Sequence, residues 1–390
     1  MPSFLAAFCS TARVRAVRAV RAIRATSVLW SVLLASGCGG GAGTVNGGSG
    51  QPPTPTALGA AELGVLFADG DATSEAIARA YQQARGIPEA NMLRVTLPTR
   101  TDAIDSAAFN ALKASIDARL PAGVQATLLT WSAPSRVVGV QGMQGVQGAC
   151  AMGITAALAL GYDVRYCGRC SATATTAYYN SGSARPFTNL GIRPSMMLGA
   201  ATLAEAQVLI QRGVAADRLM TTGNAQATAW LVRTSDPSRN SREADFRALA
   251  GTTVPRLQVD FVDNTSGTGS DEITGRSNVL FYFTGLPRVS QAASNTWLPG
   301  AAADHLTSYG GVLPDGNGQM VATEWLRAGA TASYGTVEEP CAFEQKFPRA
   351  SVLVSRYRQG DTLIEAYWKS VQWPGQGLFV GEPLARPWAP

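Results

Sequence analysis

Residues 62–86 read ELGVLFADGDATSEAIARAYQQARG, a short apolar run followed by a segment with helical spacing. The apolar run is typical of a buried strand, because it is short and ends at turn residues. In the second segment, Ile77, Tyr81 and Ala84 lie on one helical face, and Gly86 is placed to end the helix. The stretch therefore predicts a strand followed by a helix, the unit from which parallel sheets are built.

The same rhythm continues along the chain and predicts an α/β fold with a mostly parallel sheet flanked by helices. Because the folded body exceeds the usual size of one domain, we expect an N-terminal lobe at 58–250 and a C-terminal lobe at 251–390. The further strands are expected at 92–98, 126–131, 194–200, 228–234, 278–285, 300–305 and 330–337, and the further helices at 106–120, 203–213, 318–329 and 362–371.

Two stretches interrupt this rhythm. Residues 139–192 are rich in Gly, Ser and Thr, which predicts an irregular insertion at the edge of the sheet. Residues 263–278 are polar and rich in turn formers, which predicts a surface loop. Long loops of the first kind are often functional, so the insertion is a candidate for part of a site.

The N-terminus has the features of an export signal. Five arginines and no acidic residue precede a short apolar run, and the run ends in LLASGC at Cys38. Residues 1–37 are therefore expected to be a signal peptide, with Cys38 as the lipid-anchored first residue of the mature chain. The alternative is cleavage at an Ala-x-Ala-like site that leaves Cys38 unmodified. Residues 38–57 are rich in Gly and Pro, have few apolar side chains, and predict a flexible tether between anchor and body.

The charge balance argues against nucleic-acid binding. Five of the 32 Lys and Arg residues lie in the leader, and the remaining 27 equal the 27 Asp and Glu residues. No basic run and no basic-aromatic pattern occurs in the body. We therefore expect an exported lipoprotein, periplasmic or bound to the outer membrane, whose membrane contact is its lipid anchor.

The cysteines of the body predict a disulfide and no metal centre. Cys167 and Cys170 have the C-x-x-C spacing of half a zinc site, but Cys150, Cys341 and one histidine do not supply the other half. In an exported protein, a bond from Cys150 to Cys167 or to Cys170 is the expected use of these residues. No Gly-rich phosphate loop with its Lys-Ser/Thr is present, so no cofactor is expected.

His305 and Cys341 are the candidate catalytic pair. Each follows an expected strand, so both could open onto the same rim of a parallel sheet. A cysteine needs a nearby base to form its thiolate, and His305 is the only imidazole in the sequence. Asp304 points away from its neighbour on an extended chain, so Glu338 or Glu339 would have to orient the imidazole. The alternative is a buried free thiol at Cys341 and a histidine held by Asp304 or a backbone carbonyl.

Several long stretches of the body resemble an uncharacterised bacterial family found in species that carry exosortase, a membrane enzyme that sorts proteins. The resemblance implies an exported protein in a surface-sorting or exopolysaccharide context, with no assigned reaction. The stretches are RGIPEANMLRV, RPSMMLGA, LIQRGVAAD, VLFYFTGL, GAAADHLTSYGG, WLRAGATASYGTVEEPC, KFP and EAYWKSVQWPGQGLFVGEPLARP.

A more distant likeness concerns the C-terminal third. The stretches GATASYGT and VGEPLARP resemble the tail of the gingipain-type, caspase-like cysteine peptidases. That resemblance places the family's histidine near Thr284 and Gly285, and its cysteine near Thr307 or Ser308. Neither place holds the expected residue. Two hypotheses follow: the pair has moved to His305 and Cys341 in an active peptidase or transpeptidase-like hydrolase, or the scaffold has no pair and binds a peptide or surface protein.

Overall fold

The computed structural model describes residues 57–139 and 150–390, which belong to one compact unit. The expected signal peptide, Cys38 and the tether up to residue 56 lie outside the described residues. Within them, no helix is long and apolar enough to cross a membrane.

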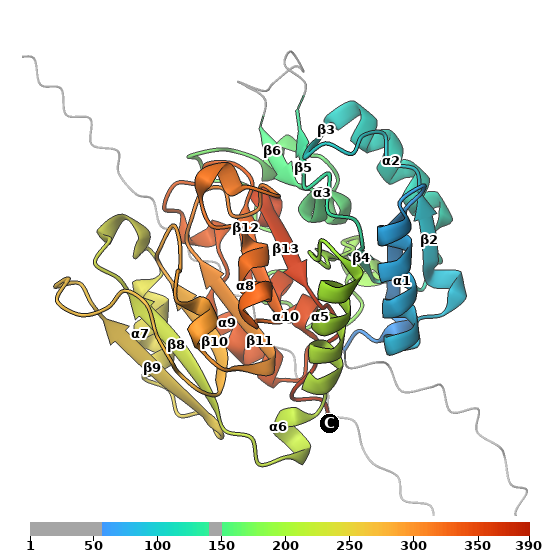
Figure 1. Ribbon diagram of the computed structural model, residues 1–390. Helices are drawn as coiled ribbons and strands as arrows, with labels where there is room; N and C mark the ends of the chain where they lie inside the picture. Colours follow the sequence, from blue (N-terminus) through green and yellow to red (C-terminus); the bar gives the residue numbers. More distant parts are fainter. Residues whose placement is uncertain (1–56, 140–149) are drawn as a thin grey trace, which may run out of the picture. The chain divides into compact units, whose positions relative to one another are not determined.

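A sheet of ten strands runs through the body, flanked by helices on both faces, and confirms the predicted fold class (Figure 1). The strand order across the sheet is β2-β1-β4-β7-β13-β12-β11-β10-β8-β9. The strands are β1 (Leu63–Ala68), β2 (Met92–Val95), β4 (Ala126–Leu129), β7 (Ser195–Met197), β8 (Ala227–Arg233), β9 (Leu257–Asp263), β10 (Val279–Thr284), β11 (Trp297–His305), β12 (Ala332–Thr336) and β13 (Gly377–Gly381).

The sheet consists of two parallel halves that run in opposite directions. In the first half, β2, β1, β4 and β7 are parallel, and β13 continues their direction beside β7. In the second half, β12, β11, β10, β8 and β9 are parallel to one another, and β12 is antiparallel to β13. The carboxyl ends of the two sets of strands therefore lie at opposite edges of the sheet.

The change of direction does not coincide with the expected lobe boundary at residue 250. β8 precedes that boundary, yet it pairs with β9 and β10 of the second half. The boundary falls between α7 and β9, two elements of the same half. β9 was not among the expected strands, although its sequence LQVDFVD alternates apolar and polar residues as an edge strand does.

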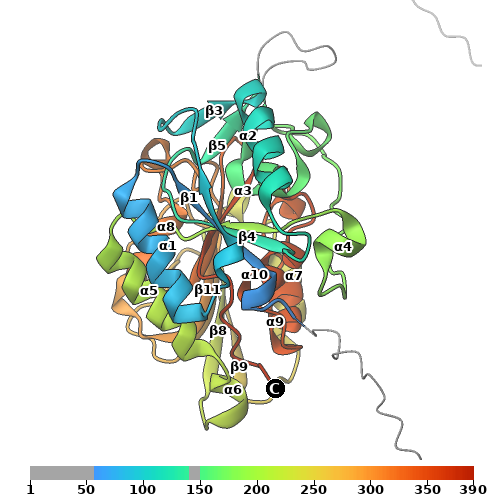
Figure 2. The same ribbon diagram turned by 90° about the vertical axis from the view of Figure 1, so that its right-hand side faces the viewer.

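The helices cover the sheet in two layers (Figure 2). α1, α5 and α8 lie on one face, and α2, α3, α7, α9 and α10 lie on the other. Neighbouring residues of β10 show the alternation: Tyr282 packs on Trp325 of α8, and Phe281 packs on Tyr357 of α9. The helices are α1 (Ala72–Arg85), α2 (Ser106–Arg119), α3 (Ile154–Leu160), α4 (Pro186–Leu190), α5 (Leu203–Ala216), α6 (Leu219–Thr222), α7 (Glu243–Ala250), α8 (Ala322–Ala328), α9 (Ala350–Arg358) and α10 (Leu363–Ser370).

Helix α1 begins and ends at residue types that favour helix ends. Asp71 accepts a hydrogen bond from the Ser74 amide at 3.0 Å and caps the first turn. Gly86 ends the helix in the left-handed region, with φ 66°, as predicted. Ile77 and Tyr81 are buried against the sheet, whereas Ala84 is exposed.

The predicted insertion at 139–192 is more regular than expected, and its residues 140–149 lie outside the described part. β6 (Ala151–Gly153) pairs with β5 (Arg136–Val138), which pairs with β3 (Ala103–Asp105), in a small second sheet. α3 has the sequence ITAALAL and is buried almost all round, because it packs between this sheet and strands β7 and β13. Between α3 and α4 the chain contains only one short 3₁₀ turn.

Candidate functional site

The strand order of the second half turns back at β8. From β8 the chain passes through α7 to the edge strand β9, and then returns to β10 on the other side of β8. In open α/β sheets, ligands bind at the carboxyl ends of strands where the order turns back in this way. The ends of β8 and β10 are therefore the first place to look for a site.

Residues 234–242, which we call the switch loop, cover this place. The Asn240 side chain accepts the Thr234 amide at 3.0 Å and donates to the Thr234 carbonyl at 2.8 Å, so the loop is closed on itself. The Thr234 hydroxyl donates to the Gly285 carbonyl at 3.1 Å and joins the loop to the end of β10. A side chain at Gly285 would place its Cβ 2.3 Å from the Arg239 carbonyl oxygen, so this close approach requires glycine.

Two neighbouring cavities open beside the switch loop. Both are lined by Ser238 and Ala342, and we call the two together the switch groove. The inner cavity, of about 230 Å³, is also lined by Arg239, Leu306, Thr307, Ser308, Glu339, Pro340 and Cys341. The outer cavity, of about 510 Å³, is also lined by Arg233, Thr234, Ser235, Pro237, Asn240, Ser241, Glu243 and Thr265.

Three donors converge on one oxygen at the wall of the inner cavity. The Thr307 hydroxyl and the amides of Ser308 and Tyr309 donate to Gln319 Oε1 at 2.6, 3.0 and 2.9 Å. The Gln319 carboxamide thus holds the turn that follows β11. Thr307 and Ser308, the positions where the resemblance places the family's cysteine, line the groove.

His305 is not on the rim, contrary to the sequence prediction. It is 1% exposed and points toward α8, where Nδ1 accepts a hydrogen bond from Trp325 Nε1 at 2.9 Å. Because an indole nitrogen only donates, the His305 proton is on Nε2, which donates to the Met320 carbonyl at 3.0 Å. Burial lowers the pKa of His305 to about 4, so the ring is neutral at pH 7.

The side chain of Asp304 lies on the opposite face of β11 and binds Arg242. Arg242 Nη1 is 2.5 Å from Asp304 Oδ2, and Nη2 donates to the Thr284 carbonyl at 2.9 Å. All three residues are buried, and burial raises the pKa of Asp304 to about 6. Asp304 and the Thr284 side chain therefore belong to the core beneath the groove and not to its lining.

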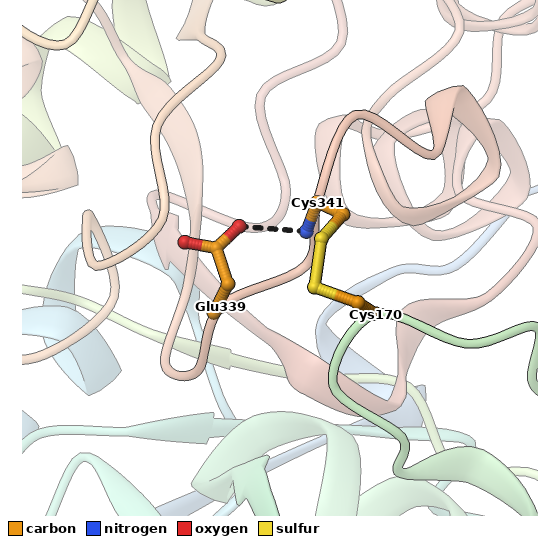
Figure 3. Close-up of side chains that lie close together, drawn as sticks. All are labelled: Cys170, Glu339 and Cys341. Atoms are coloured by element: carbon orange, nitrogen blue, oxygen red, sulfur yellow. Dashed lines mark hydrogen bonds between the residues drawn. A yellow bond between two sulfur atoms is a disulfide. The ribbon is translucent and has the colours of Figure 1, made fainter. Parts of the chain in front are cut away.

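Disulfide bonds use all four cysteines of the described chain. Cys150 is joined to Cys167, which is one of the two pairings expected from the sequence, with a Cα–Cα distance of 5.8 Å. Cys170 is joined to Cys341, with a Cα–Cα distance of 5.1 Å (Figure 3). Sequence spacing did not suggest the second bond, because 171 positions separate its two cysteines.

The predicted His305–Cys341 pair is therefore wrong. Cys341 has no free thiol, and both ring nitrogens of His305 are already bonded inside the core. The alternative of a buried free thiol at Cys341 is wrong for the same reason. A buried, hydrogen-bonded histidine agrees with the non-catalytic alternative, although its partners are Trp325 and Met320 and not Asp304.

The two glutamates after β12 hold the chain around the disulfide. Glu338 accepts the Ala151 amide at 3.0 Å and pairs with Arg169 at 2.8 Å, so it fixes the insertion against the second half. Glu339 accepts the Cys341 amide at 2.7 Å (Figure 3). Ligand atoms of Cys170, Glu339 and Cys341 lie within 4.8 Å of one another, but a metal needs thiolates and these sulfurs are bonded to each other.

Comparisons with known proteins give little more. No protein-family model and no curated protein matches the chain. A solved structure described as "Structure of Protease" matches with a TM-score of 0.44 and 11% sequence identity, over 84% of this chain and 78% of the other. The fold class rests on the sheet and helices described above.

Proposed function

We propose that the protein is an exported, lipid-anchored factor whose switch groove binds a peptide segment of a surface protein without cleaving it. The anchor is the acylated Cys38 expected from the leader. The resemblance to exosortase-associated proteins supports a role in surface-protein sorting or in an exopolysaccharide system. The periplasm or the outer membrane is the proposed location.

The observation that carries the proposal is the chemistry of the groove. Its lining offers hydroxyls, a carboxylate at Glu339 and a guanidinium at Arg239, at the place where α/β sheets bind ligands. Within the described chain, the one imidazole is buried in the core and every cysteine is in a disulfide. A groove with polar partners but no activated nucleophile fits binding better than hydrolysis.

The two disulfides support the proposed export. One bond joins two cysteines of the insertion, and the other joins the insertion to the loop after β12. Disulfides of this kind persist in oxidising compartments such as the bacterial periplasm.

A titration of fluorescent peptides tests the proposal. The probe is a set of unstructured decapeptides with varied side chains, added to the purified mature protein and followed by fluorescence anisotropy. Ser238→Trp and Ala342→Trp each place a bulky ring where the two cavities meet, and both positions are exposed, so the fold should tolerate the change. For a peptide that the unchanged protein binds, we expect the affinity to fall about tenfold or more, a loss of about 1.4 kcal/mol.

Ser115→Trp is the matched control, because Ser115 is exposed on α2 of the first half. This variant should bind like the unchanged protein. Equal binding by all three variants would contradict the proposed site. Mass spectrometry of the recovered peptides should show them intact, and progressive cleavage by the unchanged protein would contradict the non-catalytic role.

A further inference from the structure

A second group of reactive side chains lies away from the switch groove, at the start of α10. Glu365 and Lys369 lie about one turn apart on α10, and Asp361 lies just before the helix, four residues ahead of Glu365. Glu365 is 0% exposed and Lys369 is 1% exposed, and 11% of the Asp361 side chain is exposed. Two acids and one amine are thus enclosed together in the core.

The amine of Lys369 contacts both carboxyl groups. Its Nζ is 2.8 Å from Asp361 Oδ2 and 3.7 Å from Glu365 Oε1. Glu365 uses its other oxygen, Oε2, to accept the Leu58 amide and the amide and hydroxyl of Thr362, at 3.1, 2.9 and 2.8 Å. Glu365 Oε1 is buried and accepts no hydrogen bond, so it is free to interact with the nearby Lys369 Nζ.

The surroundings of the three side chains shield them largely from solvent. The ring centre of Tyr178, itself fully buried, lies 5.3 Å from Lys369 Nζ. The segment that carries Tyr178 is fixed over α10, because the Asn180 amide donates to the Lys369 carbonyl at 2.9 Å and the Thr176 amide donates to the Gln372 carbonyl at 3.0 Å. A part of the insertion therefore closes this site from solvent.

The charges of this group do not balance. If both acids were ionised, two carboxylates would share one ammonium in a buried place. Burial raises the pKa of both Asp361 and Glu365, although the charges of Lys369, Arg356 and Arg386 act in the opposite direction on Asp361. An amine beside two acids that share a proton, largely shielded from solvent, is an arrangement in which an amine and a carboxylic acid can condense.

We propose that Lys369 and Asp361 join in an intramolecular amide bond, with Glu365 carrying the proton. A proton first passes from the Lys369 ammonium to the Asp361 carboxylate. The lone pair of Nζ then forms a bond to Asp361 Cγ, Glu365 Oε1 takes a proton from Nζ, and it returns that proton to the hydroxyl that leaves Cγ as water. One N–C bond forms, one C–O bond breaks, and nothing is oxidised or reduced.

The product suits the site better than the separate side chains do. The amide removes an ammonium and a carboxylate from the interior, where each charge is costly. Its N–H has Glu365 Oε1 as a ready acceptor. The bond would link the residue before α10 covalently to the last turn of that helix. Leu58, at the start of the folded body, is bonded to Glu365 of the same helix.

An exposed pair in the same protein supplies a matched comparison. Lys113 Nζ is 2.7 Å from Asp117 Oδ2 on α2, a contact as short as that of Lys369 with Asp361. These side chains are 21% and 41% exposed, and the partner of Asp117 Oδ1 is Arg193 and not a second acid. If contact alone were sufficient, both pairs would condense, whereas the proposal restricts the reaction to the buried pair.

The test is the mass of the purified, full-length mature protein after its disulfides have been reduced. The expected mass is that of the sequence, with its lipid, less one molecule of water. Proteolysis should then yield a branched peptide that links Asp361 to Lys369, and an ordinary unbranched peptide that contains Lys113 and Asp117. Glu365→Gln should restore the full mass, and Lys369→Arg should do the same.

Several outcomes would overturn the proposal. The first is an unchanged mass of the wild-type protein after prolonged incubation at neutral pH, and this result does not depend on whether any variant folds. The second is a water loss that maps to an Asp–Gly step, such as Asp69–Gly70 or Asp315–Gly316, instead of a branched peptide. The third is an undiminished water loss in Glu365→Gln, which would remove the assigned proton carrier.

Discussion

The two halves of the sheet differ at the places where their strand order turns back. In the first half this place lies between β1 and β4, where the buried hydroxyls of Ser74 and Thr130 bond to each other at 2.9 Å. In the second half it lies between β8 and β10, where the switch loop covers the strand ends and Ser238 lines two cavities. At the first place the core elements bond directly to each other, whereas the second place is covered by an added loop.

This difference shows that the sheet architecture alone does not make the groove. Both halves are built from strands and crossover helices, and both turn back once. The cavities exist because the chain after β8 folds over β10 at Gly285, and because the disulfide holds the loop after β12 beside it. Changes in the core should therefore alter stability, whereas changes at the exposed loop positions should alter binding.

The largest expected effect on stability concerns the two disulfides. Cys170–Cys341 joins the two halves, and Cys150–Cys167 lies within the insertion. Replacing Cys170 and Cys341 by Ser removes a link across 171 positions, and loop-closure entropy predicts a loss of up to about 5 kcal/mol in unfolding free energy. Replacing Cys150 and Cys167 removes a link across 17 positions, for which the same relation gives about 3 kcal/mol. Urea unfolding under non-reducing conditions measures the loss of unfolding free energy in each double variant. Equal losses, or a larger loss for the Cys150 and Cys167 replacement, would contradict this expectation.

The buried ion pair under the groove should have the next largest effect. Arg242→Met leaves the buried carboxyl of Asp304 without its partner and should cost about 3–5 kcal/mol of unfolding free energy. The control is Arg79→Met in the exposed Arg79–Glu89 pair of the first half, which should cost less than about 1 kcal/mol. Thermal or urea unfolding of both variants measures the loss of unfolding free energy. Similar losses in the two variants would show that the Arg242–Asp304 pair stabilises the protein no more than an exposed ion pair does.

His305 predicts a specific pH dependence of stability. Its pKa in the folded protein is about 4, below the ordinary 6.5, so its contribution to stability is present above pH 6.5 and is lost as the pH falls toward 4. The loss should reach about 3 kcal/mol over that range. Asp304 acts oppositely, because its raised pKa of about 6 adds stability as the pH falls from 6 toward 4.

A variant separates the two contributions. His305→Gln retains Asp304, so the difference in unfolding free energy between wild type and variant should shrink by about 3 kcal/mol from pH 6.5 to pH 4. Urea unfolding followed by tryptophan fluorescence at several pH values gives this difference. A difference that does not change with pH would contradict the buried, neutral state of His305.

The smallest expected effect on stability concerns Gln319, which holds the turn at the wall of the groove. Gln319→Ala removes the acceptor shared by Thr307, Ser308 and Tyr309 and should cost about 1–2 kcal/mol. Gln319→Glu keeps an acceptor at that place and should cost less. Amide hydrogen exchange at Ser308 and Tyr309 should accelerate in the Ala variant, and unchanged exchange would show that the carboxamide does not hold this turn.

Much of the fold was predictable because its signals are local. The apolar run at 62–67, the helical spacing of Ile77 and Tyr81 and the stop at Gly86 each act over a few residues, and each has its expected counterpart in the structure. Helix α3 was missed because its apolar run is short and follows a Gly-rich stretch. The opposite direction of the two halves was missed because no local pattern records how β13 pairs with β7 and β12.

The site was less predictable, because it depends on contacts between distant parts of the chain. Thr307 and Ser308, where the resemblance places the family's cysteine, line the groove. Of the two glutamates expected to orient His305, Glu339 lines the groove and Glu338 does not. His305 is the last residue of β11, and strand alternation turns its ring toward Trp325. The face on which a strand residue lies changes with a shift of one residue, and a short apolar run does not reveal it. Ser238 carried no signal beyond a turn-rich composition, and Gln319 was expected inside a helix at 318–329, whereas α8 begins only at Ala322.

Photo-crosslinking is the sharpest test of the proposal that the switch groove binds a peptide without cleaving it. A photoreactive amino acid at position 342 of the mature protein is exposed to light in the presence of the bound peptide, with position 115 on α2 as the control. We expect intact peptide to become attached to the protein at position 342 and not at position 115, and this attachment to be lost when Ser238→Trp is added. Equal attachment from both positions, or recovery of the peptide only as cleaved fragments, would contradict it.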